Sequence, residues 1–152
     1  MRSVIESVFG FRRPVSKGEA IGFRLIEIVT GIFASHYAWT WALYMMHLED
    51  IFLPLGVAHY LNLSVFFQSP WPFINAALIS GLVIAGALRL YRHGYLGALI
   101  LLHVQYAARF SQGEIPHSQN ATGVLLLALG IGAVFSASPA LRQRFSMGIA
   151  YL

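Results

Sequence analysis

Residues 21–46 read IGFRLIEIVTGIFASHYAWTWALYMM, an apolar stretch in which only Arg24 and Glu27 carry charge. An α-helix needs about 20 mostly apolar residues to cross the roughly 30 Å of hydrocarbon in a bilayer. Three further stretches approach this requirement, at about residues 71–90, 95–110 and 121–140. The sequence therefore predicts an all-α fold, a polytopic integral membrane four-helix bundle.

The composition of the chain supports this prediction. Hydrophobic residues make up 57% and charged residues 11% of the 152 residues, and the mean hydropathy is +0.66. A soluble domain normally has about 25% charged residues, and a chain with so few cannot cover a water-exposed surface without large apolar patches. The chain has no cysteine, so disulfides, thiolate metal ligands and cysteine nucleophiles are excluded.

The segment between the first two spans is harder to interpret. Residues 51–67 are apolar but are broken by Pro54, Gly56 and Asn62, and they are few for a crossing. We expect an interfacial or re-entrant segment between the first and second helices. A fifth span is the alternative, and it would reverse the orientation of everything after it.

Basic residues favour four crossings. With four spans, nine of the ten basic residues lie on the side of the N-terminus and only Arg109 lies opposite. This satisfies the rule that cytoplasmic loops of membrane proteins are rich in Lys and Arg, whereas five spans would place Arg89 and Arg92 opposite the basic N-terminus. We therefore expect both termini on the cytoplasmic side, in the bacterial inner (cytoplasmic) membrane.

The chain divides into a membrane domain and two tails. We expect a cytosolic N-terminal tail over residues 1–19, a four-helix transmembrane domain over 20–140 and a cytosolic C-terminal tail over 141–152. The first tail has no small-residue cleavage site, so we interpret it as retained rather than as a signal peptide. The formal charge is +4, but its basic residues lie beside apolar spans, which favours lipid and not nucleic acid as a partner.

Small residues at steps of four indicate where helices pack. The second span has Ala77, Gly81 and Ala85, and the fourth has Gly132 and Ser136. Small side chains at this spacing let helix backbones approach closely in lipid. The alternative is that Gly and Ala are simply common in membrane helices.

Arg24 and Glu27 stand three residues apart near the cytoplasmic end of the first span. A charge inside hydrocarbon costs roughly 2.5–3.5 kcal/mol on insertion scales, so such groups pair or face the bundle interior. An intrahelical ion pair, with Arg24 reaching lipid phosphates, is the favoured interpretation. Alternatively, Glu27 continues through Gly31 to Ser35 as a stripe that lines a polar cavity for a quinone head group or a proton.

His36 and His103 lie inside the first and third spans. Two histidines on facing helices are the smallest ligand set for a haem held between them. Their estimated depths differ by about seven residues, or about 10 Å, so we expect histidines bonded to Ser, Thr or Tyr within the bundle and no haem. With Arg24 and Glu27 they complete the set of candidate quinone-binding or cavity-lining residues.

Further histidines and carboxylates gather on the outer side. They are His47, Glu49, Asp50, His59, Glu114 and His117. Imidazole and carboxylate ligands suit zinc or iron, but these residues lack a recognised ligand spacing, so ordinary loop residues are favoured and no metal is predicted. Nucleotide-binding loops, nucleophile elbows and zinc-protease patterns are absent from the sequence, and no catalytic residue is assigned.

The layout resembles a known group of membrane proteins. The first span opens with Gly22-Phe23-Arg24-Leu25 and an acid at Glu27, the second ends Leu88-Arg89-Leu90-Tyr91-Arg92-His93-Gly94, and Gly113-Glu114-Ile115-Pro116-His117 precedes the fourth. Over about residues 18–138 this resembles the DoxX-like four-helix proteins and the HTTM membrane region of vitamin-K-dependent carboxylases. The resemblance implies quinone-linked oxidation or an accessory role beside redox enzymes. The carboxylases need a large extramembrane domain that this chain lacks, so carboxylation is not expected.

Two functions follow from these observations. The first is a non-catalytic accessory subunit that packs against larger subunits of a membrane redox, respiratory or photosynthetic complex. The alternative is a DoxX-like, quinone-interacting oxidoreductase component. The first is favoured because the sequence carries no redox-cofactor motif. Larger membrane subunits and lipids are the expected partners, no resident cofactor is expected, and a quinone or a lipid is the ligand left open.

Overall fold

The computed structural model describes residues 16–47, 55–110 and 120–135. These residues form an all-α, four-helix arrangement, which confirms that part of the prediction. The elements are α2 (Lys17–Met45), the 3-10 helices η1 (Gly56–His59) and η2 (Ser64–Phe67), α3 (Trp71–Ala87), α4 (Gly94–Phe110) and α5 (Asn120–Phe135). Across the described ranges, none of the helices combines the length and the apolar character that a membrane crossing requires.

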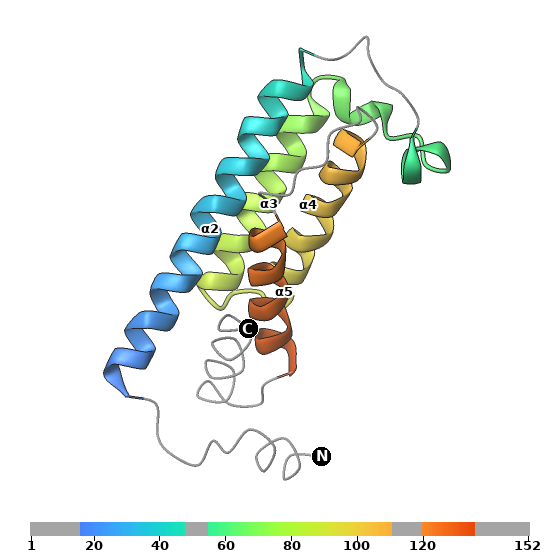
Figure 1. The fold of residues 1–152 in the computed structure, drawn as a ribbon. Coiled ribbons are helices and arrows are strands. Elements are labelled where there is room, and N and C mark those ends of the chain that lie inside the picture. Colours follow the sequence, from blue (N-terminus) through green and yellow to red (C-terminus); the bar gives the residue numbers. More distant parts are fainter. Residues whose placement is uncertain (1–15, 48–54, 111–119, 136–152) are drawn as a thin grey trace.

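The helices run antiparallel to their neighbours in the chain (Figure 1). α2 packs along α3, α3 along α4, and α4 along α5, while α5 also touches α2. This order brings the start of α2, the end of α3, the start of α4 and the end of α5 to one end of the bundle, the lower end in Figure 1. Both 3-10 helices lie at the opposite, upper end.

The helix boundaries differ from the predicted spans at two places. α2 begins four residues earlier than residue 21, because Ser16 and Glu19 form a capping box: the Glu19 amide donates to the Ser16 hydroxyl (3.2 Å) and the Ser16 amide donates to the Glu19 carboxylate (2.7 Å). α3 ends at Ala87 rather than at residue 90, because Arg89 turns into the left-handed region with φ of 65°. The rest of the predicted fourth span, beyond Phe135, lies outside the described residues.

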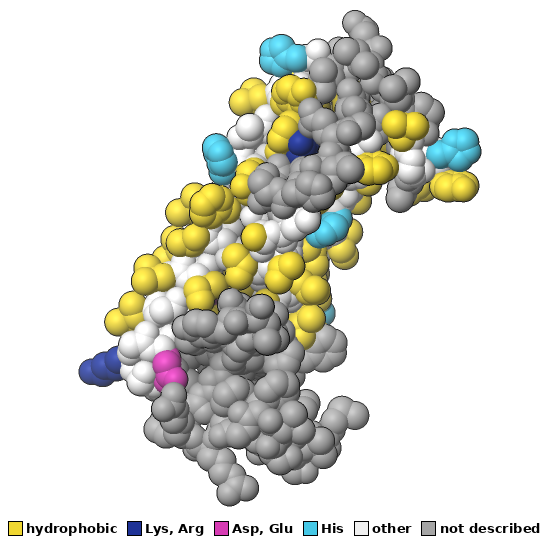
Figure 2. All heavy atoms as spheres, in the orientation of Figure 1, with side chains coloured by type: hydrophobic (Ala, Val, Ile, Leu, Met, Phe, Trp, Pro, Cys, Tyr) yellow, Lys and Arg dark blue, Asp and Glu magenta, His cyan; other side chains and the backbone are white. Residues whose placement is uncertain are grey.

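Large apolar side chains cover the outside of the described bundle. Figure 2 shows hydrophobic side chains over its middle and the visible charged side chains toward its two ends. On α2, Ile21 and Ile32 are each 61% exposed and Leu43 is 57% exposed, and on α4 Ile100 is 62% exposed. The apolar residues of these helices are therefore not collected on the inner faces alone.

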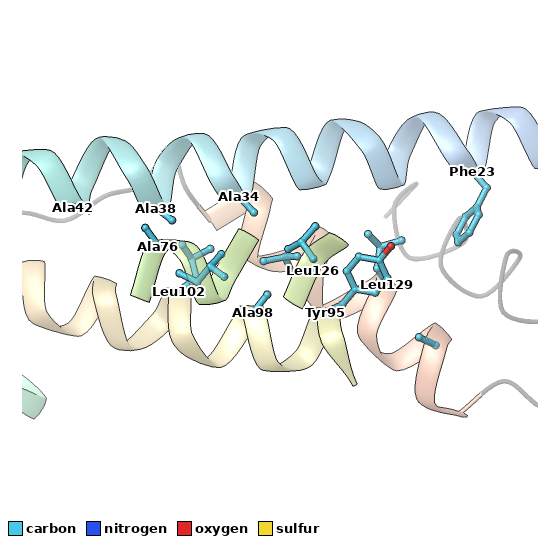
Figure 3. Packing of buried hydrophobic residues seen from close by; sticks show 13 residues of the cluster. Phe23, Ala34, Ala38, Ala42, Ala76, Tyr95, Ala98, Leu102, Leu126 and Leu129 are labelled. Carbon is cyan, nitrogen blue, oxygen red and sulfur yellow. The ribbon is translucent and has the colours of Figure 1, made fainter. Parts of the chain in front are cut away.

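Small and polar side chains make up most of the inner face of α2. Its buried residues are Phe23, Glu27, Thr30, Ala34, Ala38, Ala42 and Met45. Spaced three or four residues apart, they follow one face of an α-helix. Figure 3 shows the three alanines of this stripe turned toward the other helices of the core. Because an alanine side chain is short, the neighbouring helix can lie close to the α2 backbone.

Glycines mark the closest helix approaches. A Cβ added at Gly31 of α2 would lie 2.9 Å from Cγ1 of Val83 in α3, and one at Gly94 would press on the Leu82 carbonyl oxygen. The predicted small-residue stripe of the second span is largely turned away from the other helices of this chain: Ala77 and Gly81 are exposed, Ala85 is half-buried, and a Cβ at Gly81 would meet nothing within 4 Å. Small residues at steps of four made this stripe look favourable for packing, but the inward face of α3 is a different one.

The inward face of α3 lies on the opposite side of the helix from Gly81. The buried residues of α3 are Pro72, Asn75, Ala76, Ile79, Val83 and Gly86. Gly132 of α5 is buried, and Ser136 lies outside the described residues.

The ambiguous connection holds two short turns. In its described part, residues 55–70, η1 and η2 have four residues each, so this part contains no fifth long helix. Leu63 and Phe67 are buried beside Met45 and Ala108, in a small cluster that is separate from the main core. This described part of the connection therefore packs against the upper ends of α2 and α4.

Candidate functional site

A buried carboxylate forms the best-defined polar site. Glu27 is only 1% exposed, and three side chains donate hydrogen bonds to it. Arg24 Nη1 reaches Oε2 at 2.8 Å, Arg89 Nη1 and Nη2 reach Oε1 and Oε2 at 2.5 and 3.0 Å, and the Tyr95 hydroxyl reaches Oε1 at 2.9 Å. We call these four residues, Arg24, Glu27, Arg89 and Tyr95, the Glu27 cluster.

The Glu27 cluster joins three helices at the lower end of the bundle. Arg24 lies one turn before Glu27 on α2, Arg89 follows the end of α3, and Tyr95 lies in the first turn of α4. Charge-assisted hydrogen bonds compensate a buried carboxylate for the water contacts that it has lost. Because its donors come from three helices, the carboxylate fixes how α2, α3 and α4 meet.

The backbone at the end of α3 aims Arg89 at Glu27. The Arg89 amide donates to the Gly86 carbonyl (3.1 Å) and the Leu90 amide to the Ala85 carbonyl (2.9 Å), which is the pair of bonds of a Schellman helix end. The residue with left-handed φ in this motif is usually glycine, and another residue there costs about 1 kcal/mol. Here the position is taken by Arg89, whose guanidinium makes the two bonds to the carboxylate and lies 5.6 Å from the centre of the Phe23 ring.

The sequence predicted half of this cluster. The ion pair of Arg24 and Glu27 is present, and Arg24 also donates to the Ala87 carbonyl at 2.9 Å. Sequence reasoning missed Arg89 and Tyr95, which are the partners from other helices. A signal was available, since both flank the predicted turn on the same side of the bundle as Glu27, and a buried acid requires compensation.

The structure does not bring His36 and His103 together as ligands within the core. Both rings are exposed on the outer surface of their helices. The predicted partners are also wrong for His103, whose Nδ1 bonds to the Leu99 carbonyl oxygen at 2.9 Å and not to Ser, Thr or Tyr. Because a carbonyl oxygen only accepts, Nδ1 carries the proton and a neutral ring leaves Nε2 unprotonated.

Two shallow grooves flank the His103 ring. One, of about 450 Å³, runs between α4 and the connection and is lined in part by Leu61 and Leu63. The other, of about 380 Å³, runs between α4 and α5, where Gly123 gives the ring room. His103 and Leu99 line both grooves.

A second buried polar layer lies near the upper end. Gln105 of α4 is fully buried, and its amide nitrogen donates to the Ala38 carbonyl of α2 at 3.1 Å. Arg109, one turn further along α4, is 3% exposed and lies over the ring of Trp41. The one basic residue that the sequence separates from the others is thus held between α2 and α4.

The outer histidines do not gather into a metal site in the described part of the chain. The His47 ring bonds to the Leu43 carbonyl at 2.8 Å, and the His59 ring stands edge-on to Tyr60. Within residues 16–47, 55–110 and 120–135 there is no group of three or more His, Asp or Glu side chains close enough to hold a metal ion. The remaining candidates, Glu49, Asp50, Glu114 and His117, lie outside these ranges.

The comparisons with known proteins add no relative from which a role could be carried over. Protein-family models, curated proteins and solved structures were all compared with the chain, and none of them matches it.

Proposed function

We propose that this chain is an integral membrane protein and serves as a small, non-catalytic accessory subunit of a membrane redox, respiratory or photosynthetic complex. The observation that carries the accessory role is the outward face of α3. There Ala77 and Gly81 are exposed, and no other part of the described chain approaches the position of a Gly81 Cβ within 4 Å.

The distribution of polarity supports a lipid environment. In α2 the inward face carries Glu27 and Thr30, both 1% exposed, while Ile21, Leu25 and Ile28 point outward with more than half of their surface exposed. A water-soluble helix has the opposite arrangement, with its apolar stripe toward the core. In a membrane, ionisable groups face the bundle interior and apolar side chains face lipid. This proposal stands on which faces are apolar and not on helix lengths.

Charge supports one orientation of the bundle. Lys17, Arg24, Arg89 and Arg92 belong to the lower end, where α2 begins and α3 ends, and Arg109 belongs to the upper part. Cytoplasmic ends of membrane helices are rich in Lys and Arg. We therefore assign the lower end to the cytoplasm of a bacterial cell and the connection with η1 and η2 to the outer interface.

The exposed face of α3 fits a partner helix. Ala77 and Gly81 are four residues apart, and Ile74 and Leu78 beside them have 41% and 51% of their surface exposed. In lipid, two small residues at this spacing let a second helix approach closely, and the larger apolar side chains pack around the contact. The buried stripe of α3 already serves α2 and α4, so this face remains for a larger membrane subunit.

The test is co-purification in mild detergent after extraction of membranes with alkaline carbonate. The chain should stay with the membranes and should retain its partner subunits on an affinity tag. Gly81→Leu should release those subunits, whereas Gly22→Leu, at another glycine with open space around it, should not. If Gly81→Leu keeps every partner, the α3 face is not the interface. Recovery of the chain in the carbonate supernatant would refute the membrane assignment itself.

The second candidate function is the DoxX-like, quinone-interacting component, and His103 favours it. Its ring lies between two grooves, of which the one beside the connection is almost entirely apolar, and its Nδ1 is bonded to the Leu99 carbonyl, so Nε2 can accept a hydrogen bond from a quinol hydroxyl. Titration of the purified chain with a fluorescent ubiquinol analogue tests this function. Saturable binding that His103→Leu removes and His36→Leu leaves intact would support it, and no saturable binding would refute it.

A further inference from the structure

A third groove runs along the outside of the bundle between α2 and α3. Its volume is about 510 Å³, and its lining is almost entirely apolar. The groove exists because Gly31 and Ala87, at its base, have no side chain or only a short one. Ile28 and Ile32 of α2 and Ile84 of α3 form its walls. On α2 the lining extends from Ile28 to Ser35, about 10 Å along the helix axis, so the groove offers an apolar surface to a stretch of hydrocarbon chain.

A cation stands at the lower end of this groove. Arg24 precedes Ile28 and Ile32 at steps of four residues, so all three lie on one face of α2. The Arg24 side chain is 52% exposed, and its bonds to Glu27 and to the Ala87 carbonyl both use Nη1. The guanidinium is thus held in place by one nitrogen while much of its surface faces outward, beside Ala87, which lines the groove.

The charges of the Glu27 cluster do not cancel. Two guanidinium groups, those of Arg24 and Arg89, share the single carboxylate of Glu27. Arg89 makes two bonds to that carboxylate and is 26% exposed, so the surplus positive charge falls on the more exposed Arg24. An anion placed against Arg24 would balance the cluster without entering the core.

We infer that this groove binds an anionic phospholipid, with the phosphate on Arg24 and one acyl chain between α2 and α3. The inference rests on the proposed membrane location. A free phosphate would satisfy the guanidinium but would leave the adjoining groove empty, and a neutral lipid would fill the groove but would leave the surplus charge. A lipid with a net negative headgroup meets both requirements. Its charged headgroup can lie on Arg24 while the acyl chain next to it lies in the groove.

Lipid titration of the purified chain in mild detergent, followed by native mass spectrometry, tests this inference. Phosphatidylglycerol and phosphatidylcholine with identical acyl chains are the probes. The wild-type chain should retain phosphatidylglycerol about fivefold more strongly than phosphatidylcholine, as expected for one basic residue acting on an anionic headgroup. Millimolar inorganic phosphate should not displace the bound lipid, and displacement would show that the anion site does not require the acyl chain.

Three variants separate the contribution of the Arg24 guanidinium from that of the apolar groove. Arg24→Gln should remove the preference for phosphatidylglycerol, and Ser35→Leu, which fills the upper part of the groove without touching the Glu27 cluster, should weaken binding of both lipids. Arg92→Gln removes one positive charge from the same end away from the groove and should change neither. If Arg24→Gln does not fold, Ser35→Leu still has to weaken binding for the inference to hold.

Two further results would overturn the inference alone. They are equal retention of both lipids by the wild-type chain, and equal loss of preference in Arg24→Gln and Arg92→Gln. Either result leaves the chain in carbonate-washed membranes, so the proposed function survives it. Release of the chain from those membranes would instead refute the membrane location on which the inference rests.

Discussion

The guanidinium of Arg89 makes two hydrogen bonds to the carboxylate of Glu27, 62 residues earlier in the chain. One residue belongs to the end of α3 and the other to the inward face of α2, so the pair sets the register of the two helices that share the largest contact. Arg89 reaches the carboxylate from a left-handed backbone conformation that glycine would adopt at no cost. The side chain, rather than local backbone preference, therefore explains an arginine at this position.

Replacement of Arg89 by Leu should be the most damaging single change in the Glu27 cluster. Breaking a buried ion pair by removing one partner costs about 3–5 kcal/mol, and the lower figure applies because Arg89 is 26% exposed. Thermal unfolding in detergent, followed by circular dichroism, should show a large drop in Tm for Arg89→Leu and almost none for the exposed Arg92→Leu. Equal drops would mean that the pair is not a major contribution.

Arg24→Leu should destabilise the protein less than Arg89→Leu does. From the sequence, Arg24 is the only visible partner of Glu27, and its loss would strand the carboxylate. In the structure Arg89 and Tyr95 still donate to Glu27 after Arg24 is removed. The same unfolding measurement ranks the two variants, and the reverse order would show that Arg24 is the principal partner.

Tyr95→Phe should cost about 1.5–3 kcal/mol of stability, the range for a hydrogen bond to a charged group. The Tyr95 hydroxyl donates to Glu27 at 2.9 Å, and the side chain is 1% exposed, so phenylalanine fits the space but leaves one carboxylate lone pair unsatisfied. Tyr91→Phe, at an exposed tyrosine in the turn before α4, is the matched control and should be neutral. Combining Tyr95→Phe with Glu27→Gln should cost less than the sum of the two changes, because both remove the same bond.

Cysteine labelling should report an even number of crossings. The chain has no cysteine of its own, so single cysteines at Ser3, Ser146 and Asn62 can be compared directly. A membrane-impermeant thiol reagent applied to intact cells should label Asn62→Cys, in the connection between α2 and α3, and should spare the cysteines at Ser3 and Ser146. Labelling at Ser3 or Ser146 alone would contradict a shared side for the two termini.

The sequence predicted those features of the fold that depend on the length of apolar stretches and on the positions of charged residues. Four long apolar stretches predicted four helices, and the pair of Arg24 and Glu27 followed from the cost of a charge in an apolar helix. The long-range partners Arg89 and Tyr95 were not predictable, because nothing in local spacing states which faces of α3 and α4 meet α2.

The same cause misled the prediction of helix contacts. Small residues occur on both faces of α3, so the exposed stripe through Ala77 and Gly81 looked as suitable for packing as the buried stripe through Ala76 and Gly86. Only the placement of α2 and α4 against α3 distinguishes the two. Likewise, the outward positions of His36 and His103 depend on how each helix is rotated about its axis. Both faces of these helices are apolar, so the sequence does not show which face points inward.

Alanine at Gly94 and alanine at Gly81 should have opposite effects on stability. A Cβ at Gly94 would press on the Leu82 carbonyl oxygen and lie 2.9 Å from the Gly86 amide nitrogen. Both contacts are backbone atoms of α3, which cannot rotate away, so the turn between α3 and α4 must open. That turn carries Arg89 and leads into Tyr95, and its opening should therefore also weaken the bonds to Glu27.

Gly81→Ala is the control for Gly94→Ala, because it measures the general effect of replacing glycine by alanine in a helix without a steric clash. A Cβ there meets nothing within 4 Å, and glycine in a helix interior is less favourable than alanine by about 0.5–1 kcal/mol. Gly81→Ala should hence leave the Tm of the isolated chain unchanged or raise it, while Gly94→Ala lowers it. If Gly94→Ala acts through the Glu27 cluster, its effect should shrink when Glu27→Gln is already present. An undiminished loss in that background would show that the clash destabilises the α3–α4 turn alone.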